Sequence, residues 1–195
     1  SSVIHNLRIY KPQAGIWIDK ELTDNIASNG QPITVGVLHT GKSYSDDLHE
    51  DGVIYHYPET GRPGKDIVEI NATKNAFVHS LPVFVIYYPK PNSKLRNVRF
   101  GWIVGYDDEA KVFHISYDKP EKSASKVEET PFKLTDKGDY AEGKAKRRKG
   151  QSKFKFELIK RYGARCAICN IDIYPLLIAA HIRPKQFKGS DDPRN

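Results

Sequence analysis

Five short runs of β-branched and aromatic residues, separated by turn-forming residues, constrain the fold of this chain most strongly. The runs lie at 33–38, 53–57, 81–88, 100–106 and 112–117. Short runs of this composition, bounded by Gly, Pro, Asn and Asp, are typical of β-strands. The last two flank Asp107-Asp108-Glu109-Ala110, which predicts a β-hairpin. Residues 1–118 therefore predict a mostly-β domain, for which a barrel is one architecture. Between Asn71 and Ser80 we expect one helical turn or a short helix.

The composition changes after this domain. Residues 119–152 are rich in Lys, Glu, Ser, Asp and Gly and contain only scattered apolar residues. Such a segment buries too little apolar surface to offset its conformational entropy. We therefore expect a basic, flexible linker, with one docked stretch around Pro131–Leu134. Beyond it, the apolar residues Phe154, Leu158 and Tyr162 recur at helical spacing, and Gly163 can end that helix.

The positive charge of the chain is confined to its last part. The net charge of +7 divides into −2 for residues 1–140 and +9 for residues 141–195. This asymmetry favours a polyanion as partner of the C-terminal part, and a solvated basic linker is the open alternative. The candidate phosphate-binding residues are Lys144, Lys146, Arg147, Arg148 and Lys149.

Several protein classes are excluded by composition. No apolar run approaches the roughly 20 residues that span a bilayer, so the chain is not expected to bind or cross a membrane. The N-terminal residues lack a secretory pattern, and two cysteines are too few for a disulfide scaffold. We therefore expect a cytoplasmic protein.

Cys166 and Cys169 form a C-x-x-C pair. Two thiolates on one turn can supply half of a tetrahedral zinc shell. A redox pair and two inert thiols are the other interpretations, although the βαβ setting of thioredoxin-like redox pairs is absent. The pair is therefore a candidate for a structural zinc site, of which Cys166 and Cys169 would supply two ligands.

The C-terminal segment contains Cys166-Ala167-Ile168-Cys169, then Ala179-Ala180-His181-Ile182-Arg183-Pro184, then Asp192-Pro193-Arg194-Asn195. In this order and spacing it resembles the HNH endonuclease family, over about 40 residues. The resemblance implies a ββα fold around a divalent metal ion such as Mg²⁺. It assigns His181, on the first strand, as the general base that activates water, and Asn195 as the loop residue that orients that strand and His181. Neutral imidazole suits this role near pH 7.

The segment departs from the family pattern at two points. Ala180 stands where many relatives carry a metal-binding Asp or His, and the family's closing helix with its last His would come after Asn195. We therefore expect the chain as given to cut DNA poorly or not at all.

A second resemblance concerns the β domain. Tyr44-Ser45-Asp46-Asp47, the aromatic strand ending at Tyr57, the Gly61–Asp66 turn, Asn75-Ala76 and the Val-rich strand from Pro82 follow in an order that resembles the SRA (SET and RING associated) domain. That domain is a PUA-like β-barrel that flips a modified cytosine out of duplex DNA. By position, Tyr44 and Tyr57 match the rings that sandwich the base. Asp47 matches the carboxylate that accepts from the cytosine amine, and Asp46 is its alternative.

Together the two resemblances predict an α+β protein: an SRA-like barrel over 1–118, a linker over 119–152 and the N-terminal part of an HNH domain over 153–195. The predicted function is that of a bacterial, modification-dependent restriction endonuclease that reads 5-methyl- or 5-hydroxymethylcytosine in double-stranded DNA. Cutting both strands requires two active sites, which favours a homodimer. The alternative is a DNA- or RNA-binding reader without nuclease activity.

Overall fold

The computed structural model describes residues 3–4, 7–23, 26, 30–40, 48–90, 93–120, 132, 134–135 and 144–195. The chain divides into two compact units, one made of residues 1–106 and 111–119, the other of residues 107–110 and 120–195. No helix in the described ranges is long and apolar enough to cross a membrane.

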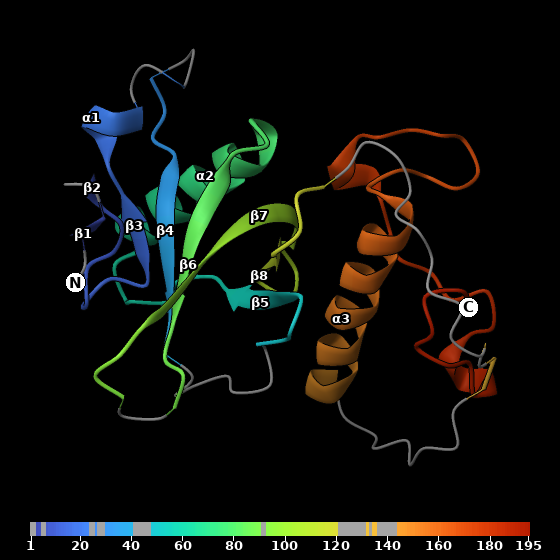
Figure 1. The fold of residues 1–195 in the computed structure, drawn as a ribbon. Helices are drawn as coiled ribbons and strands as arrows, with labels where there is room; N and C mark the ends of the chain where they lie inside the picture. The colour runs from blue at the N-terminus through green and yellow to red at the C-terminus, as the bar shows by residue number, and fades with distance from the viewer. Residues whose placement is uncertain are drawn as a thin grey trace. The chain divides into compact units, whose positions relative to one another are not determined.

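The first unit is built on a mixed six-stranded sheet with the strand order β3-β4-β6-β7-β8-β5 (Figure 1). Its strands are β3 (Ile16–Ile18), β4 (Thr34–His39), β5 (Gly52–His56), β6 (Pro82–Tyr87), β7 (Asn97–Asp107) and β8 (Val112–Ser116). Two further strands, β1 (Val3–Ile4) and β2 (Leu7–Arg8), pair with each other, and a short helix α1 (Lys20–Thr23) follows β3. β4 and β6 pair in parallel, whereas the other described pairings are antiparallel. The five expected strands are confirmed within a few residues, and the barrel form stays a prediction.

The two parallel strands carry apolar residues on both faces. Val37 and Val85 belong to the main core, whereas their neighbours Leu38 and Ile86 belong to a second cluster with Ile9. Successive strand residues point to opposite faces, so both faces of β4 and β6 are covered. This explains why their sequences are continuous apolar runs rather than alternating ones.

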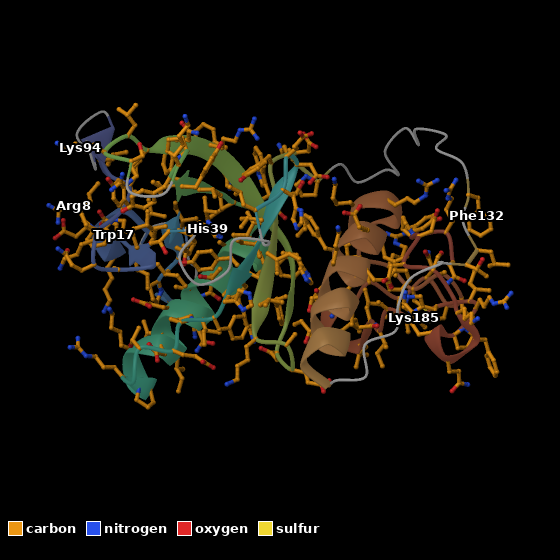
Figure 2. All side chains as sticks on the ribbon, turned by 90° about the horizontal axis from the view of Figure 1, so that it is seen from below. Arg8, Trp17, His39, Lys94, Phe132 and Lys185 are labelled. Atoms are coloured by element: carbon orange, nitrogen blue, oxygen red, sulfur yellow. The ribbon has the colours of Figure 1, made fainter. Side chains whose placement is uncertain are left out.

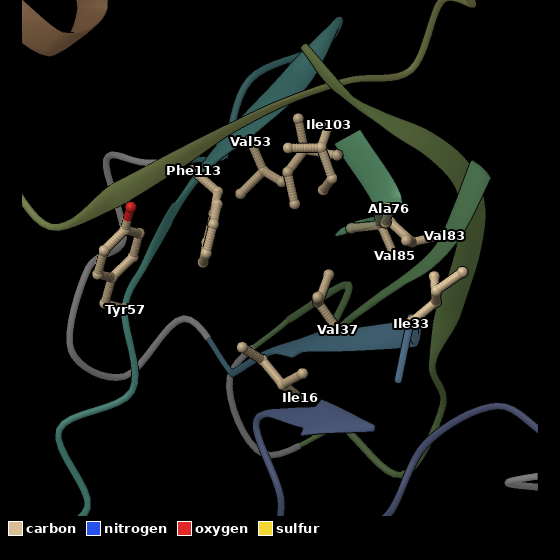
Figure 3. Close-up of a cluster of buried hydrophobic side chains, with 11 residues drawn as sticks. Ile16, Ile33, Val37, Val53, Tyr57, Ala76, Val83, Val85, Ile103 and Phe113 are labelled. Carbon is tan, nitrogen blue, oxygen red and sulfur yellow. The ribbon is translucent and has the colours of Figure 1, made fainter. Parts of the chain in front are cut away.

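The main core gathers side chains from the sheet and from the helix α2 (Pro63–Val78). Figure 3 shows its members, which include the fully buried Phe113 and Ala76 of α2. At Gly36 in β4, an added Cβ would lie 2.1 Å from the carbonyl oxygen of Ile9. The segment before β3 therefore crosses β4 at a point where only glycine leaves room.

α2 corrects the expectation of little helix. It has 16 residues and begins at Pro63, inside the segment interpreted as the Gly61–Asp66 turn. Proline is favoured in the first turn of a helix, where its missing N–H has no partner to lose. The helix lacks a clear amphipathic pattern because Ile67 is exposed, whereas Asp66 and Glu69 are buried. Asp66 accepts hydrogen bonds from Thr60 N–H and Oγ1 at 2.9 and 2.6 Å, which ties the loop to the first turn.

The predicted hairpin between β7 and β8 is confirmed. Asp107 Oδ1 accepts hydrogen bonds from the backbone N–H groups of Glu109 and Ala110 at 3.0 and 2.8 Å. Lys111 then takes a positive φ of 56°. Asp forms such local turns readily because its short side chain reaches the backbone of the following residues.

The second unit contains the long helix α3 (Lys144–Tyr162), followed by loops and the short 3-10 turns η2 (Tyr174–Leu176) and η3 (Lys185–Phe187). α3 begins at Lys144, within the range expected to be linker, so the run of basic residues at 144–149 lies on a helix. The helix ends as expected at Gly163, whose φ is 76° and whose N–H donates to Ile159 at 2.8 Å. Of the expected apolar face, Phe154 is buried but Tyr162 is 51% exposed.

A short part of the segment before α3 docks in this unit, as expected around residues 131–134. Ser190 N–H donates to the Leu134 carbonyl at 3.1 Å, and Thr135 forms a β-bridge with Gly189. The Arg194 guanidinium lies 5.1 Å from the centre of the Phe132 ring. Phe132 and Lys185 are labelled in this unit in Figure 2.

Candidate functional site

The C-x-x-C pair lies on a closed turn directly after α3. Cys166 N–H donates to the Ile171 carbonyl at 2.8 Å, and Asn170 N–H donates to the Cys166 carbonyl at 3.0 Å. Asn170 has a positive φ of 61°, which Asn tolerates better than most residues. Both cysteines are free thiols on this turn.

Backbone groups of the same turn stabilise the thiolate of Cys166. The N–H groups of Cys169 and Ile168, followed by the Cys169 side chain, hold the pKa of the Cys166 thiol below its usual range. A metal-binding cysteine must be deprotonated, and such hydrogen bonds favour that form. The turn therefore fits half of a tetrahedral zinc site. In the described part of the chain, no group of three or more His, Cys, Asp and Glu residues completes a metal shell.

The segment of residues 177–182, which follows η2, carries His181. Gln151 of α3 fixes it by donating from Nε2 to the Ala179 carbonyl at 2.8 Å. Exposure alternates along it: Ile178 and Ile182 are 88% and 81% exposed, whereas the His181 side chain is only 8% exposed. Alternation with a period of two places His181 on the face opposite the two isoleucines.

The ring of His181 stacks on Phe154 of α3. The ring centres are 3.8 Å apart and the planes differ by 7°. Phe154 is 1% exposed, so the platform under the imidazole is a rigid core residue. Aromatic pairs contribute about 0.5–1.5 kcal/mol beyond the area that they bury. The sequence places the two residues 27 positions apart in the chain, and only the tertiary structure brings them together.

Two charged residues extend this contact. His181 Nε2 lies 3.0 Å from Asp191 Oδ1, and Asp191 Oδ2 lies 2.8 Å from Lys185 Nζ. Sequence reasoning missed Phe154, Asp191 and Lys185 as partners of His181. The adjacent pair Asp191-Asp192 in the loop was the one visible signal for Asp191, and the sequence does not say which Asp faces the histidine.

Asn195 closes the loop against the segment that carries His181. Its Oδ1 accepts from the Arg183 N–H at 2.8 Å, and its Nδ2 donates to the Arg183 and Ser190 carbonyls at 3.2 and 2.8 Å. The Ile182 N–H donates to the Asn195 carbonyl at 2.8 Å. Asn195 is 3% exposed, so these bonds are protected from water. An orienting role therefore fits its geometry.

The rest of the loop is shaped to bring Asn195 to this place. Asp192 accepts from Arg194 N–H at 2.9 Å and pairs with its guanidinium at 2.6 Å, and Asn195 N–H donates to the Asp192 carbonyl. At Gly189, an added Cβ would lie 1.7 Å from the Arg183 carbonyl oxygen. Gly189 is therefore required by the close approach of two backbone segments.

The candidate base pocket is described only at one of its positions. Tyr44, Asp46 and Asp47 lie outside the described residues. Tyr57 is 9% exposed and belongs to the main core, with its ring centre 4.4 Å from that of Phe113. Lys74 of α2, which sequence reasoning did not single out, places its Nζ 5.9 Å from the Tyr57 ring centre and 4.4 Å from the Tyr106 ring centre. The Tyr57 ring therefore packs against Phe113 in the main core.

The candidate phosphate-binding residues lie on the first two turns of α3, and their side chains are outside the described atoms. A helix with its positive charges in the first turns places them against the positive end of its own dipole. The helix dipole therefore does not stabilise these positive charges, whereas an anionic partner would.

Comparison with known proteins identifies no relative: no family model, no curated protein and no solved structure matches the chain.

Proposed function

We propose that this chain belongs to a modification-dependent DNA endonuclease, with a reader for modified cytosine in its β domain and an HNH-type site around His181. The observation that carries the nuclease part is the clamp between Asn195 and Arg183, next to His181, whose side chain is stacked and 8% exposed. An imidazole held by a stacked ring and by a hydrogen bond is what a general base needs in order to meet a substrate in one orientation.

In the proposed reaction, His181 removes a proton from water, and the resulting hydroxide attacks the scissile phosphorus of DNA. Asn195 keeps the His181 segment and the loop in register through the backbone of Arg183. A divalent metal ion such as Mg²⁺ would stabilise the charge that develops on the phosphate. The described residues do not supply a complete ligand set for it, so no further step is assigned to the metal.

The basic start of α3 is proposed to bind the DNA backbone. Lysine and arginine contacts to phosphate position a protein on DNA, whereas contacts to base edges provide specificity. Specificity is accordingly assigned to the β domain, with Asp47, or Asp46 as its alternative, and Tyr44 and Tyr57 as the residues that read the flipped base.

The Cys166–Cys169 turn is proposed to hold half of a structural zinc site, which would fix the segment that leads to His181. A closing helix of the kind that the resemblance implies would cover the exposed side chains of Ile178 and Ile182.

The test compares His181→Ala with the wild type. Both proteins contain residues 1–195 and any residues that follow Asn195. Duplexes carrying 5-methylcytosine, 5-hydroxymethylcytosine or cytosine are incubated with Mg²⁺ or Mn²⁺. We expect cutting of modified duplexes by the wild type, no cutting by His181→Ala, and similar affinity of both for DNA. His79→Ala, at an exposed histidine that follows α2, is the matched control and should cut normally.

A reader without nuclease activity is the second candidate function. It is favoured by the incomplete ligand set among the described residues. Selective binding of modified duplexes, with no cutting in either metal ion by the protein that includes any residues beyond Asn195, would establish this second function instead of the first.

A further inference from the structure

The contact between Asp191 and His181 determines which ring nitrogen carries the proton. His181 Nε2 lies 3.0 Å from Asp191 Oδ1, while Asp191 Oδ2 lies 2.8 Å from Lys185 Nζ. A carboxylate in an ion pair can only accept hydrogen bonds. The hydrogen atom of the 3.0 Å contact therefore belongs to Nε2, and in the neutral ring the lone pair is on Nδ1.

Phe154 and Asp191 restrict two different motions of the ring. The parallel stack on Phe154 fixes the plane of the imidazole, with 7° between the two planes. A half-turn about the Cβ–Cγ bond keeps that plane but exchanges Nδ1 with Cδ2 and Nε2 with Cε1. The hydrogen bond to Asp191 selects one of these two orientations, so both contacts are needed to define the position of Nδ1.

Nδ1 is the nitrogen that remains for chemistry. Among the described residues, none forms a hydrogen bond with His181 Nδ1, whereas Nε2 is bound to Asp191. A lone pair on Nδ1 can accept a proton from a water molecule, while Nε2 cannot do so as long as it donates to the carboxylate.

We propose that Asp191 is a positioning residue of the nuclease site, which holds His181 as the Nε2–H tautomer and leaves Nδ1 as the base. This inference rests on the proposed function. In the reaction, a proton passes from water to Nδ1, the hydroxide oxygen forms a bond to phosphorus, and the P–O bond to the leaving group breaks. The leaving oxygen keeps the electron pair and takes up a proton from solvent.

Because of Lys185, the proposal predicts a change of the His181 tautomer in Asp191→Asn. The ammonium group of Lys185 can only donate hydrogen bonds, so the amide oxygen of Asn, rather than its NH₂, is expected to face Lys185. The amide NH₂ then faces Nε2 and donates to it. The ring is thereby driven into the Nδ1–H tautomer, which has no lone pair on Nδ1.

The experiment measures the nitrogen chemical shifts of the His181 ring by NMR at about pH 8, where an ordinary imidazole is neutral. His181→Gln identifies the signals of this ring among those of the seven histidines. We expect a protonated Nε2 in the wild type and a protonated Nδ1 in Asp191→Asn. Asp172→Asn, which removes the same charge at an exposed position, should resemble the wild type. In Asp191→Asn with Lys185→Met, the amide oxygen is free to face Nε2, and the wild-type tautomer should return.

Cutting of modified duplexes by the same variants of the full chain provides the second readout. Asp191→Asn should reduce the rate on the order of 10²- to 10⁴-fold, the usual contribution of a general base, with little change in DNA affinity. Equal ring shifts in the wild type and Asp191→Asn would overturn the inference, while the nuclease proposal would stand if His181→Ala still abolished cutting. If the wild-type protein, including any residues beyond Asn195, cut no duplex, both would be overturned.

Discussion

Asn195 binds both backbone polar groups of Arg183, accepting from its N–H at 2.8 Å and donating to its carbonyl at 3.2 Å. This exchange resembles a pair of strand hydrogen bonds made by a side chain. It ties the end of the loop to the residue two positions after His181. The position of the proposed base therefore depends on a residue that, among the described hydrogen bonds, forms none with its ring.

The first prediction concerns this clamp. Asn195→Asp replaces the Nδ2 donor with an oxygen that faces the carbonyls of Arg183 and Ser190. Leaving buried groups without partners costs about 1–3 kcal/mol each, so the loop should open more often. Amide hydrogen exchange of Ile182 and Arg183 should become faster in Asn195→Asp. The same change at Asn170 should leave these two amides unaffected, because Asn170 lies on the cysteine turn, and equal protection in Asn195→Asp would contradict the clamp.

The second prediction concerns the thiol of Cys166. Because hydrogen bonds from its own turn lower its pKa, the thiolate should form at a lower pH than in an unstructured peptide. Alkylation with iodoacetamide, followed residue by residue with mass spectrometry, should reach its full rate at correspondingly lower pH. Unfolding in urea should restore ordinary behaviour, since the N–H groups of Ile168 and Cys169 are then lost. Zn²⁺ should protect both cysteines of the full chain if the proposed site forms, and unprotected alkylation would argue against it.

The third prediction concerns the basic start of α3. If these residues bind phosphates, the affinity for DNA should fall steeply with salt, and each lost contact should reduce the slope of log K against log[salt] by about 0.9. Gln substitutions at Lys146, Arg147 and Arg148 should lower that slope for modified and unmodified duplexes alike. A triple Gln variant at the exposed residues Lys11, Lys20 and Lys90 removes the same charge and serves as the control. Identical slopes for the two triple variants would show that the helix start is only a solvated surface.

The fourth prediction concerns the base pocket. Asp47→Ala should reduce the preference for modified DNA by about tenfold or more, because a good contact to a base edge discriminates by about 1–3 kcal/mol. Binding to unmodified DNA should change little. A uniform gain in affinity for every duplex would instead identify Asp47 as an acidic surface residue near phosphate. Fluorescence titration of both duplexes with one variant distinguishes these results.

Tyr57 requires a different variant. Because Tyr57 lies in the core against Phe113, truncation to Ala is expected to cost about 3–5 kcal/mol of stability. Loss of DNA binding in Tyr57→Ala would then have two explanations. Tyr57→Phe retains the ring and its packing, so it should avoid the cost of the truncation and keep the proposed stacking on the base.

The sequence determined the strands of the β domain because their signal is local. Runs such as Pro82–Tyr87 and Val112–Ser116 combine β-branched and aromatic residues between turn residues, and Asp107 forms the hairpin turn within four residues of chain. The end of α3 at Gly163 was determined in the same way. Helix α2 was largely missed because its buried Asp66 and Glu69 and its exposed Ile67 reverse the pattern that reveals a helix.

The sequence also identified His181 and Asn195 as candidates, but only the tertiary structure determined what surrounds them. Phe154 reaches His181 from α3, and Asn195 reaches Arg183 across a loop that Gly189 allows to close tightly. Which of two adjacent carboxylates faces the imidazole depends on the path of that loop, and there Asp192 turns toward Arg194 while Asp191 turns toward His181. Contacts of this kind join residues that are distant in the chain, so composition and periodicity do not predict them. They depend on how the segments pack in the folded structure.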